Sequence, residues 1–198
     1  MDMARLILIN GAPGSGKSTL ARMYVDDHPL ALALDIDTVR AMLGHWLDEP
    51  TEAGLIARRM ALEMARVQLT AGRDVVVPQF LGRPDFVVSL ERLCHDVGAE
   101  FVEFALLSGP QEAVDRFVRR SAAPQTAEHR DAAALLGRSG GVNALLGMYE
   151  RLIEVVASRP RTRTVVTVAG QVDRAYRDLV TQVASNGQVT GSANDPAS

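Results

Sequence analysis

Lysine and cysteine are nearly absent from this chain, and each scarcity has a consequence. Cys94 is the single cysteine, so no intramolecular disulfide can form, which fits a reducing cytoplasm. Arginine supplies most of the basic charge, because 20 of the 21 Lys and Arg residues are Arg and the one lysine is Lys17. Against 24 Asp and Glu residues this gives a formal net charge of −3, with no basic block. Binding to nucleic acid or to an anionic membrane through bulk charge is therefore disfavoured.

Long hydrophobic runs and metal-binding motifs are also missing. The first apolar run, Leu6 to Ile9, follows no basic segment and is too short for a signal peptide or a membrane span. His45, His95 and His129 lack the spacing of metal ligands. Hydrophobic residues make up 47% and charged residues 23% of the 198 positions, as in an average globular domain. The sequence predicts one cytoplasmic domain and leaves the oligomeric state open.

What the chain does contain is a regular alternation of short apolar strands and helices. The patterns predict strands at 5–10, 30–35, 74–78, 100–107 and 162–169, and helices at 18–25, 38–46, 51–71, 84–97, 111–120, 143–157 and 173–183. Such an alternation indicates a parallel sheet covered on both faces, a three-layer α/β sandwich. We expect one domain over 1–184, with a mobile excursion at about 121–141 and a disordered tail at 185–198.

A phosphate-binding motif joins the first strand to the first helix. The run Gly11-Ala12-Pro13-Gly14-Ser15-Gly16-Lys17-Ser18-Thr19 fits G-x-x-x-x-G-K-[ST] in the required context of strand and helix. Its glycines let backbone N–H groups surround phosphates, and the helix N-terminus adds a positive dipole end. We expect Lys17 to bridge the β- and γ-phosphates of ATP and the Ser18 hydroxyl to bind Mg²⁺. The alternative is a glycine-rich turn without a ligand.

An acidic pair follows the second predicted strand. Ligands of open parallel sheets lie beyond the carboxyl ends of the strands, so Asp35 and Asp37 are expected beside the phosphate loop. Strand alternation would place both on one side, with Ile36 in the core. We assign Asp37 as the base that accepts a hydroxyl proton and Asp35 as the metal-side residue. The alternative is that they cap a helix beginning at Thr38. Arg40 is expected to bind a polar or anionic substrate group, or else to be solvated.

At the end of the third predicted strand an acidic residue is lacking. Many P-loop enzymes carry a carboxylate there, whereas this strand reads Val75-Val76-Val77-Pro78-Gln79. The metal would then depend on Ser18, the phosphates, water and the acidic pair. Gln79 becomes a candidate for contacting substrate or ordering water, against the alternative that it caps the loop.

Together, the N-terminal P-loop and the Asp35-x-Asp37-x-x-Arg40 segment resemble the small kinases related to nucleoside-monophosphate kinases. Shikimate kinase, chloramphenicol phosphotransferase, gluconate kinase and zeta-toxin-like kinases are the nearest in pattern. The resemblance covers about residues 5–184, although only these two motifs are specific. It implies a five-stranded parallel sheet of strand order 2-3-1-4-5 with a helical lid.

The resemblance also implies roles for residues near the lid and after the last strand. Arg116 is expected to stack on adenine and Arg120 to approach the γ-phosphate, because a guanidinium suits both stacking and charge stabilisation. Gln171 lies in the loop that passes adenine in such folds. Plain alternatives are solvated arginines, including Arg130 and Arg138, and an ordinary strand–helix turn.

The combined prediction is an ATP- and Mg²⁺-dependent kinase that phosphorylates a hydroxyl of a small molecule, either a metabolite or an antibiotic. Two alternatives stay open. One is a zeta-toxin-like kinase acting on a nucleotide sugar. The other is a P-loop protein that binds nucleotide for regulation and is not a kinase.

Overall fold

The computed structural model describes residues 3–108, 115, 118 and 141–186. Its centre is a five-stranded sheet of order β2-β3-β1-β4-β5, in which every neighbouring pair is parallel. The strands are β1 (Arg5–Gly11), β2 (Leu32–Ala33), β3 (Val75–Pro78), β4 (Glu100–Leu107) and β5 (Arg163–Val166). The predicted sheet, including its strand order, is therefore confirmed.

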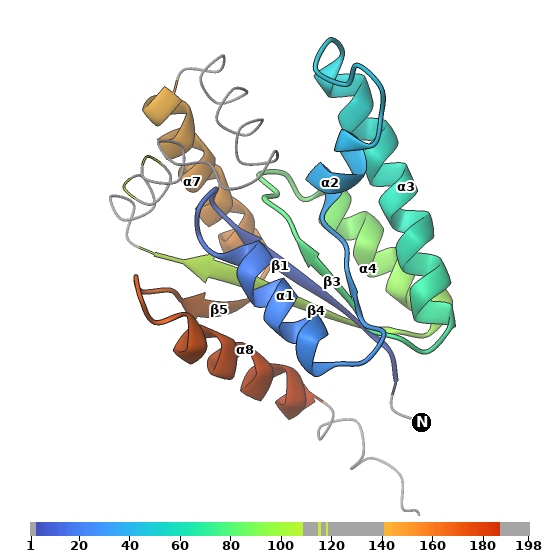
Figure 1. Ribbon diagram of the computed structural model, residues 1–198. Coiled ribbons are helices and arrows are strands. Elements are labelled where there is room, and N and C mark those ends of the chain that lie inside the picture. Colours follow the sequence, from blue (N-terminus) through green and yellow to red (C-terminus); the bar gives the residue numbers. More distant parts are fainter. Residues whose placement is uncertain (1–2, 109–114, 116–117, 119–140, 187–198) are drawn as a thin grey trace, which may run out of the picture.

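Helices cover both faces of this sheet (Figure 1). They are α1 (Lys17–Asp27), α2 (Ile36–Ala41), α3 (Pro50–Thr70), α4 (Asp85–Val97), α7 (Gly141–Ser158) and α8 (Val172–Asn186). One buried cluster packs α2, α3 and α4 on side chains such as Leu6, Leu8 and Val77, and the other packs α1 and α8 on Ile7, Ile9 and Phe104. The alternation of neighbouring β1 residues between the two clusters is the period-two geometry of a strand buried on both sides. This confirms the three-layer sandwich.

Local sequence explains where several elements begin and end. Gly98 ends α4 in the left-handed conformation, with φ 68°, and its N–H bonds back to the helix. Helix α3 packs through a row of alanines four residues apart, which lets it lie close to the sheet. Pro50 occupies its first turn, so α3 begins at Pro50 and Thr51 is not its cap, contrary to the sequence prediction.

Three predicted boundaries are wrong for identifiable reasons. Strand β2 is limited to two residues because Leu30 takes a left-handed φ of 64° and its carbonyl accepts a hydrogen bond from Gln68. Strand β5 ends before Gly170, whose φ of 77° belongs to the turn that leads into α8. That last helix continues to Asn186, two residues into the segment predicted as a tail.

Several predictions lie outside the described residues. They are most of the helix at 111–120, of which Asp115 and Val118 are described and helical, nearly all of the excursion at 121–141 and the tail beyond residue 186. In the described parts of the chain, no helix is long and apolar enough to cross a membrane.

Candidate active site

The phosphate loop joins β1 to α1 as the motif predicts. Gly14 and Gly16 have φ of 85° and 98°, a region that favours glycine. A Cβ on Gly11 would lie 2.6 Å from Ser15 Oγ and 3.2 Å from Leu106 Cβ, so a side chain at position 11 would displace the Ser15 hydroxyl and crowd Leu106. The motif's glycines are thus required by the backbone path itself.

This loop has the features of a phosphate cradle. Among the described residues, no side chain caps the first N–H groups of the eleven-residue helix α1. These N–H groups, together with the helix dipole, favour an anion at this position. The Lys17 ammonium donates to the Ala12 carbonyl at 3.0 Å, which folds the lysine over its own loop. The residues of the loop therefore fit the phosphates of a nucleotide.

Asp35 lies beside the start of α1 and also caps the next helix. Its Oδ1 accepts the Asp37 N–H at 2.9 Å, and its Oδ2 accepts the Ser18 hydroxyl at 3.3 Å. The first bond makes Asp35 the N-cap of α2, so this helix begins at Ile36 and not at Thr38 as the sequence suggested. Asp35 is thus a helix cap, although of a helix that begins at Ile36, and the capping carboxylate also faces Ser18.

Asp35 and Asp37 lie close together for a different reason from the one that the sequence predicted. Because α2 begins at Ile36, Asp37 belongs to the first helical turn, and strand alternation does not govern the pair. Ile36 is buried in the core as expected. Burial, followed by the negative charge of Asp37, raises the pKa of Asp35, while backbone hydrogen bonds and the Lys17 charge act in the opposite direction. An Asp35 carboxylate in these surroundings gains from a nearby cation.

Two oxygen donors next to a phosphate loop suit Mg²⁺. Asp35 and Ser18 supply a carboxylate and a hydroxyl, the hard ligands that this ion accepts alongside phosphates and water. In the described parts of the chain, no group of three or more His, Cys, Asp and Glu residues forms a metal site by itself. The donor set fits an ion that is held jointly with a nucleotide.

Arg40 extends the acidic pair into a short polar row. Its Nη2 lies 3.0 Å from Asp37 Oδ1, and its guanidinium carbon lies 4.4 Å from the centre of the Trp46 ring. Within the described structure, its buried Nε has no hydrogen-bond partner. The cation–π contact with the buried Trp46 and the ion pair with Asp37 together hold the guanidinium in place.

Gln79 follows β3 at the same edge of the sheet. Its N–H donates to the Ile9 carbonyl at 3.1 Å, which ties the residue to the end of β1. The side-chain Oε1 is buried and finds no donor among the described residues. A donor group of a substrate or a water molecule would satisfy this oxygen.

Asn10 is a residue of this site that sequence reasoning missed. It is fully buried at the end of β1, and its Nδ2 donates to the Leu81 carbonyl at 3.0 Å. Its Oδ1 accepts the N–H groups of Gly11 and Leu81, each at 2.9 Å. One side chain therefore fastens the loop after β3 to the first glycine of the phosphate loop. The available signal was an asparagine in an otherwise apolar strand.

A pocket of about 410 Å³ lies between the phosphate loop and the segment that follows β5. Ser15, Gly16 and Thr19 form one wall, and residues 167–172, including Gln171, form another. The structure thus brings Gln171 and the phosphate loop to the same pocket. Arg116, Arg120, Arg130 and Arg138 lie outside the described residues.

Solved structures share this fold over nearly the whole chain. A Chloroflexus aurantiacus protein proposed to be a kinase has a TM-score of 0.67 at 20% identity, covering 96% of this chain and 98% of its own. A Sinorhizobium meliloti gluconokinase has a TM-score of 0.62 at 15% identity, covering 96% and 99%. The Mycobacterium tuberculosis APS kinase, solved with AMPPNP and APS, has a TM-score of 0.60 at 16% identity, covering 93% and 99%. At these identities, the likeness shows the fold of small P-loop kinases.

Sequence relatives extend the comparison. Uncharacterized proteins of Mycobacterium tuberculosis and Mycobacterium bovis are 34% identical over an alignment of 146 residues that covers 68% of this chain. The aligned part spans 29% of the length of these relatives. The family model described as an AAA domain (AAA_33) matches residues 6–138, more than half of the sequence. The chain therefore belongs to the AAA_33 family of AAA domains.

Proposed function

We propose that this protein is an ATP-dependent kinase that transfers the γ-phosphoryl group to a hydroxyl of a small molecule, either a metabolite or an antibiotic. The observation that carries the proposal is the contact between Ser18 and Asp35, with Asp37 and Arg40 next to it. This contact joins the phosphate loop to the polar row of Asp35, Asp37 and Arg40 at the carboxyl edge of the parallel sheet, where such folds bind their ligands. Two solved proteins of similar fold are named a gluconokinase and an APS kinase, and these names support phosphoryl transfer as the reaction type.

The nucleotide would be held by two parts of the site. The loop from Gly11 to Thr19 surrounds the phosphates with backbone N–H groups, and Lys17 contacts the β- and γ-phosphate oxygens. The pocket lined by Gln171 takes the base. ATP supplies the phosphoryl group, and Mg²⁺ neutralises the charge of its phosphates. Ser18 and Asp35 provide the protein's oxygen ligands on the metal side.

The acceptor would lie between α2 and the end of β3. Asp37 accepts the proton of the attacking hydroxyl, and Arg40 orients the acceptor through a polar or anionic group. Their ion pair keeps both side chains oriented. The buried Gln79 Oε1 accepts a hydrogen bond from a second donor of the acceptor. Arg116 and Arg120 keep their proposed roles at the adenine and at the γ-phosphate.

The test is whether ATP turnover depends on an added hydroxyl compound. ADP formation is measured with Mg²⁺ across a panel of sugars, hydroxy acids, hydroxyl-bearing antibiotics and nucleotide sugars. We expect one class to raise turnover well above the background hydrolysis and to yield a phosphorylated product by mass spectrometry. Lys17→Ala serves as the inactive control. Turnover that no hydroxyl compound raises would instead support a protein that binds nucleotide for regulation.

A further inference from the structure

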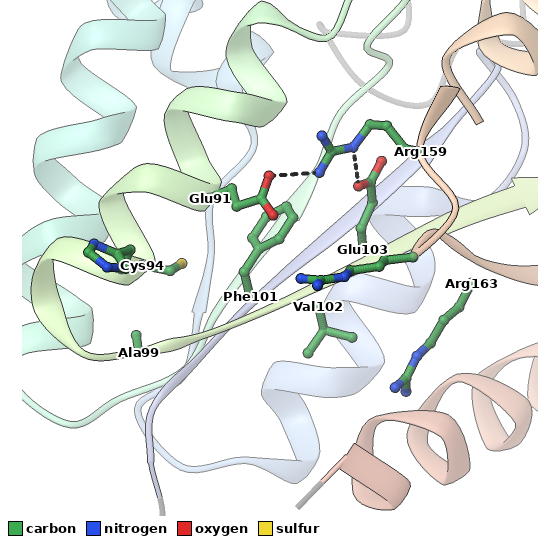
Figure 2. A pocket seen from close by; sticks show the side chains of 10 residues that line it. Glu91, Cys94, Ala99, Phe101, Val102, Glu103, Arg159 and Arg163 are labelled. Carbon is green, nitrogen blue, oxygen red and sulfur yellow. Dashed lines mark hydrogen bonds and ion pairs between the residues drawn. The ribbon is translucent and has the colours of Figure 1, made fainter. Parts of the chain in front are cut away.

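A second pocket lies at the opposite end of the sheet from the phosphate loop. It has a volume of about 610 Å³ and is formed by α4, the start of β4 and the turn between α7 and β5. Strand β5 pairs with β4 from Phe104 onward, so the first residues of β4 have no strand on that side within the described structure. We call it the Glu103 pocket after its most buried charged residue; Phe101, Val102 and Arg159 also line it (Figure 2). Arg161 is a further lining residue.

Glu103 carries an unused acceptor in this pocket. Its side chain is 3% exposed, and its Oε2 accepts a hydrogen bond from Arg159 Nε at 2.6 Å. Its Oε1 is buried and has no partner among the residues that the structure describes. A buried carboxylate oxygen without a donor is unfavourable, so this atom calls for a donor from outside the chain.

The charges beside Glu103 favour a cationic donor. Arg159 also contacts Glu91 at 3.0 Å, so one guanidinium (+1) is shared by two carboxylates (−2), and this cluster of three residues by itself carries −1 (Figure 2). The two other arginines of the lining, Arg161 and Arg163, lie outside this cluster of ion pairs. The nearby Cys94 thiol adds no charge, because burial raises its pKa to about 12. An ammonium group would satisfy the Glu103 oxygen and neutralise the remaining charge.

Arg161 gives the same pocket an anion-binding rim. It is exposed, and no described carboxylate forms an ion pair with it, whereas Arg163 donates to the carbonyl of Gln182 on α8. A guanidinium of this kind binds carboxylates well, through two parallel hydrogen bonds. Phe101, whose side chain packs on the α4 face of the sheet, adds an apolar part to the lining.

We propose that the Glu103 pocket binds a small zwitterion of the amino-acid type, with its ammonium group on Glu103, its carboxylate on Arg161 and an apolar side chain against β4. Nothing in this inference depends on the kinase activity, since the pocket lies at the amino ends of the strands. Its volume exceeds that of a single amino acid, and the ammonium group would reach the buried Glu103 Oε1 by displacing the side chains that cover it.

The experiment is a calorimetric titration of the full chain with L-valine, L-leucine and L-phenylalanine. We expect saturable binding by at least one of them, with a Kd of about 1 mM or tighter. For L-leucine, the matched probes are isocaproate, which lacks the amine, and isoamylamine, which lacks the carboxylate. Each should bind at least about tenfold more weakly, since each loses one charged contact.

Variants locate the site. Arg161→Ala should weaken binding roughly ten- to hundredfold without affecting folding, because the residue is exposed. Glu103→Gln keeps the size and should weaken binding similarly, while Arg73→Ala, at an exposed arginine outside the pocket, should leave it unchanged. Binding by none of the three amino acids, equal binding by isocaproate or isoamylamine, or an unaffected Arg161→Ala would each overturn the proposal.

Discussion

Asp37 is the residue on which the proposed chemistry depends most directly. Asp37→Asn keeps the size and one acceptor oxygen but removes the charge that pairs with Arg40. We expect phosphoryl transfer to fall by roughly a hundred- to ten-thousandfold, the usual contribution of a positioned general base. Nucleotide affinity should change only a few-fold, because Lys17 and the loop N–H groups hold the phosphates.

Single-turnover transfer, with nucleotide affinity measured separately, checks this expectation. Asp48→Asn is the matched control, because Asp48 is a largely exposed carboxylate outside the row. If Asp37→Asn retains both its transfer rate and its acceptor affinity, Asp37 is only a residue of the first turn of α2 and the catalytic assignment is wrong.

Asp35 should respond differently, since its charge is unfavourable in the protein without nucleotide. Burial and the neighbouring Asp37 charge raise the pKa of Asp35 in the folded protein. A raised acid pKa means that ionised Asp35 destabilises the fold at pH values above that pKa, and this penalty disappears as the pH falls through it. Asp35→Asn retains a capping oxygen for α2. The variant should therefore be at least as stable as the wild type at neutral pH.

Urea denaturation at several pH values measures this effect. The stability gain of Asp35→Asn over the wild type should shrink as the solution becomes acidic, and a gain independent of pH would contradict the assigned cause. In activity assays, the same variant should need more Mg²⁺ for half-maximal rate before its maximal rate declines.

These residues also show how far sequence reasoning reaches. The phosphate loop was predictable because its glycines, its lysine and its flanking elements are contiguous, and the left-handed Gly14 and Gly16 follow from local chemistry. The role of Asn10 was not predictable, because it depends on hydrogen bonds to Leu81, which lies 71 positions away. The start of α2 was misplaced because an Asp cap and a Thr cap are equally plausible from sequence, and the bond from the Asp37 N–H to Asp35 decides between them.

At the scale of elements, Asn10 couples β1 to the loop after β3. Asn10→Ala would leave three buried main-chain groups without their partner. We expect the free energy of unfolding to fall by about 2–4 kcal/mol, the range for losing several such bonds with partial relaxation. The exposed Asn143 offers a control, and Asn143→Ala should stay within about 0.5 kcal/mol.

Chemical denaturation and amide exchange test this coupling together. The Leu81 N–H, which donates to Asn10 Oδ1, should lose protection in Asn10→Ala under native conditions. Unchanged exchange at Leu81 would mean that the loop after β3 is held by other contacts, such as the bond from Gln79 to Ile9.

Element boundaries were less predictable than element order. The five strands were found because a strand buried on both faces is a continuous apolar run, and the helices that the structure describes lie between them as predicted. β3 was predicted one residue too long, and β2 and β5 were predicted too long by several residues, at positions where the apolar pattern continues past a turn. Leu30 and Gly170 adopt left-handed backbone at these turns, and an apolar Leu30 gives no sequence sign of it.

For the whole molecule, the strand order was anticipated through the resemblance to small kinases. Strand alternation alone favours a parallel sheet but does not say that β3 lies between β2 and β1. The Glu103 pocket was beyond sequence reasoning, since Glu91, Glu103 and Arg159 meet from three separate elements. The identity of the acceptor could not be predicted for a related reason. The proposed acceptor region lies between α2 and the end of β3, which are far apart in the sequence.

Nucleotide binding should be measurable as a change in the stability of the whole domain. A ligand that binds the folded chain at about 100 times its Kd stabilises it by about 2.7 kcal/mol, which for this chain length raises Tm by about 5–11 °C. We expect this shift with AMPPNP and Mg²⁺.

Lys17→Ala should abolish most of it, because Lys17 is the lysine of the phosphate loop. Without nucleotide, its Tm should stay within a few degrees of the wild type, since the half-buried Lys17 belongs to neither of the two buried clusters of the core. Arg22→Ala, at an exposed site on the same helix, is the matched control and should keep the full shift. A Lys17→Ala protein that AMPPNP stabilises as strongly as the wild type would show that the nucleotide binds elsewhere, and the phosphate loop would then lose its assigned role.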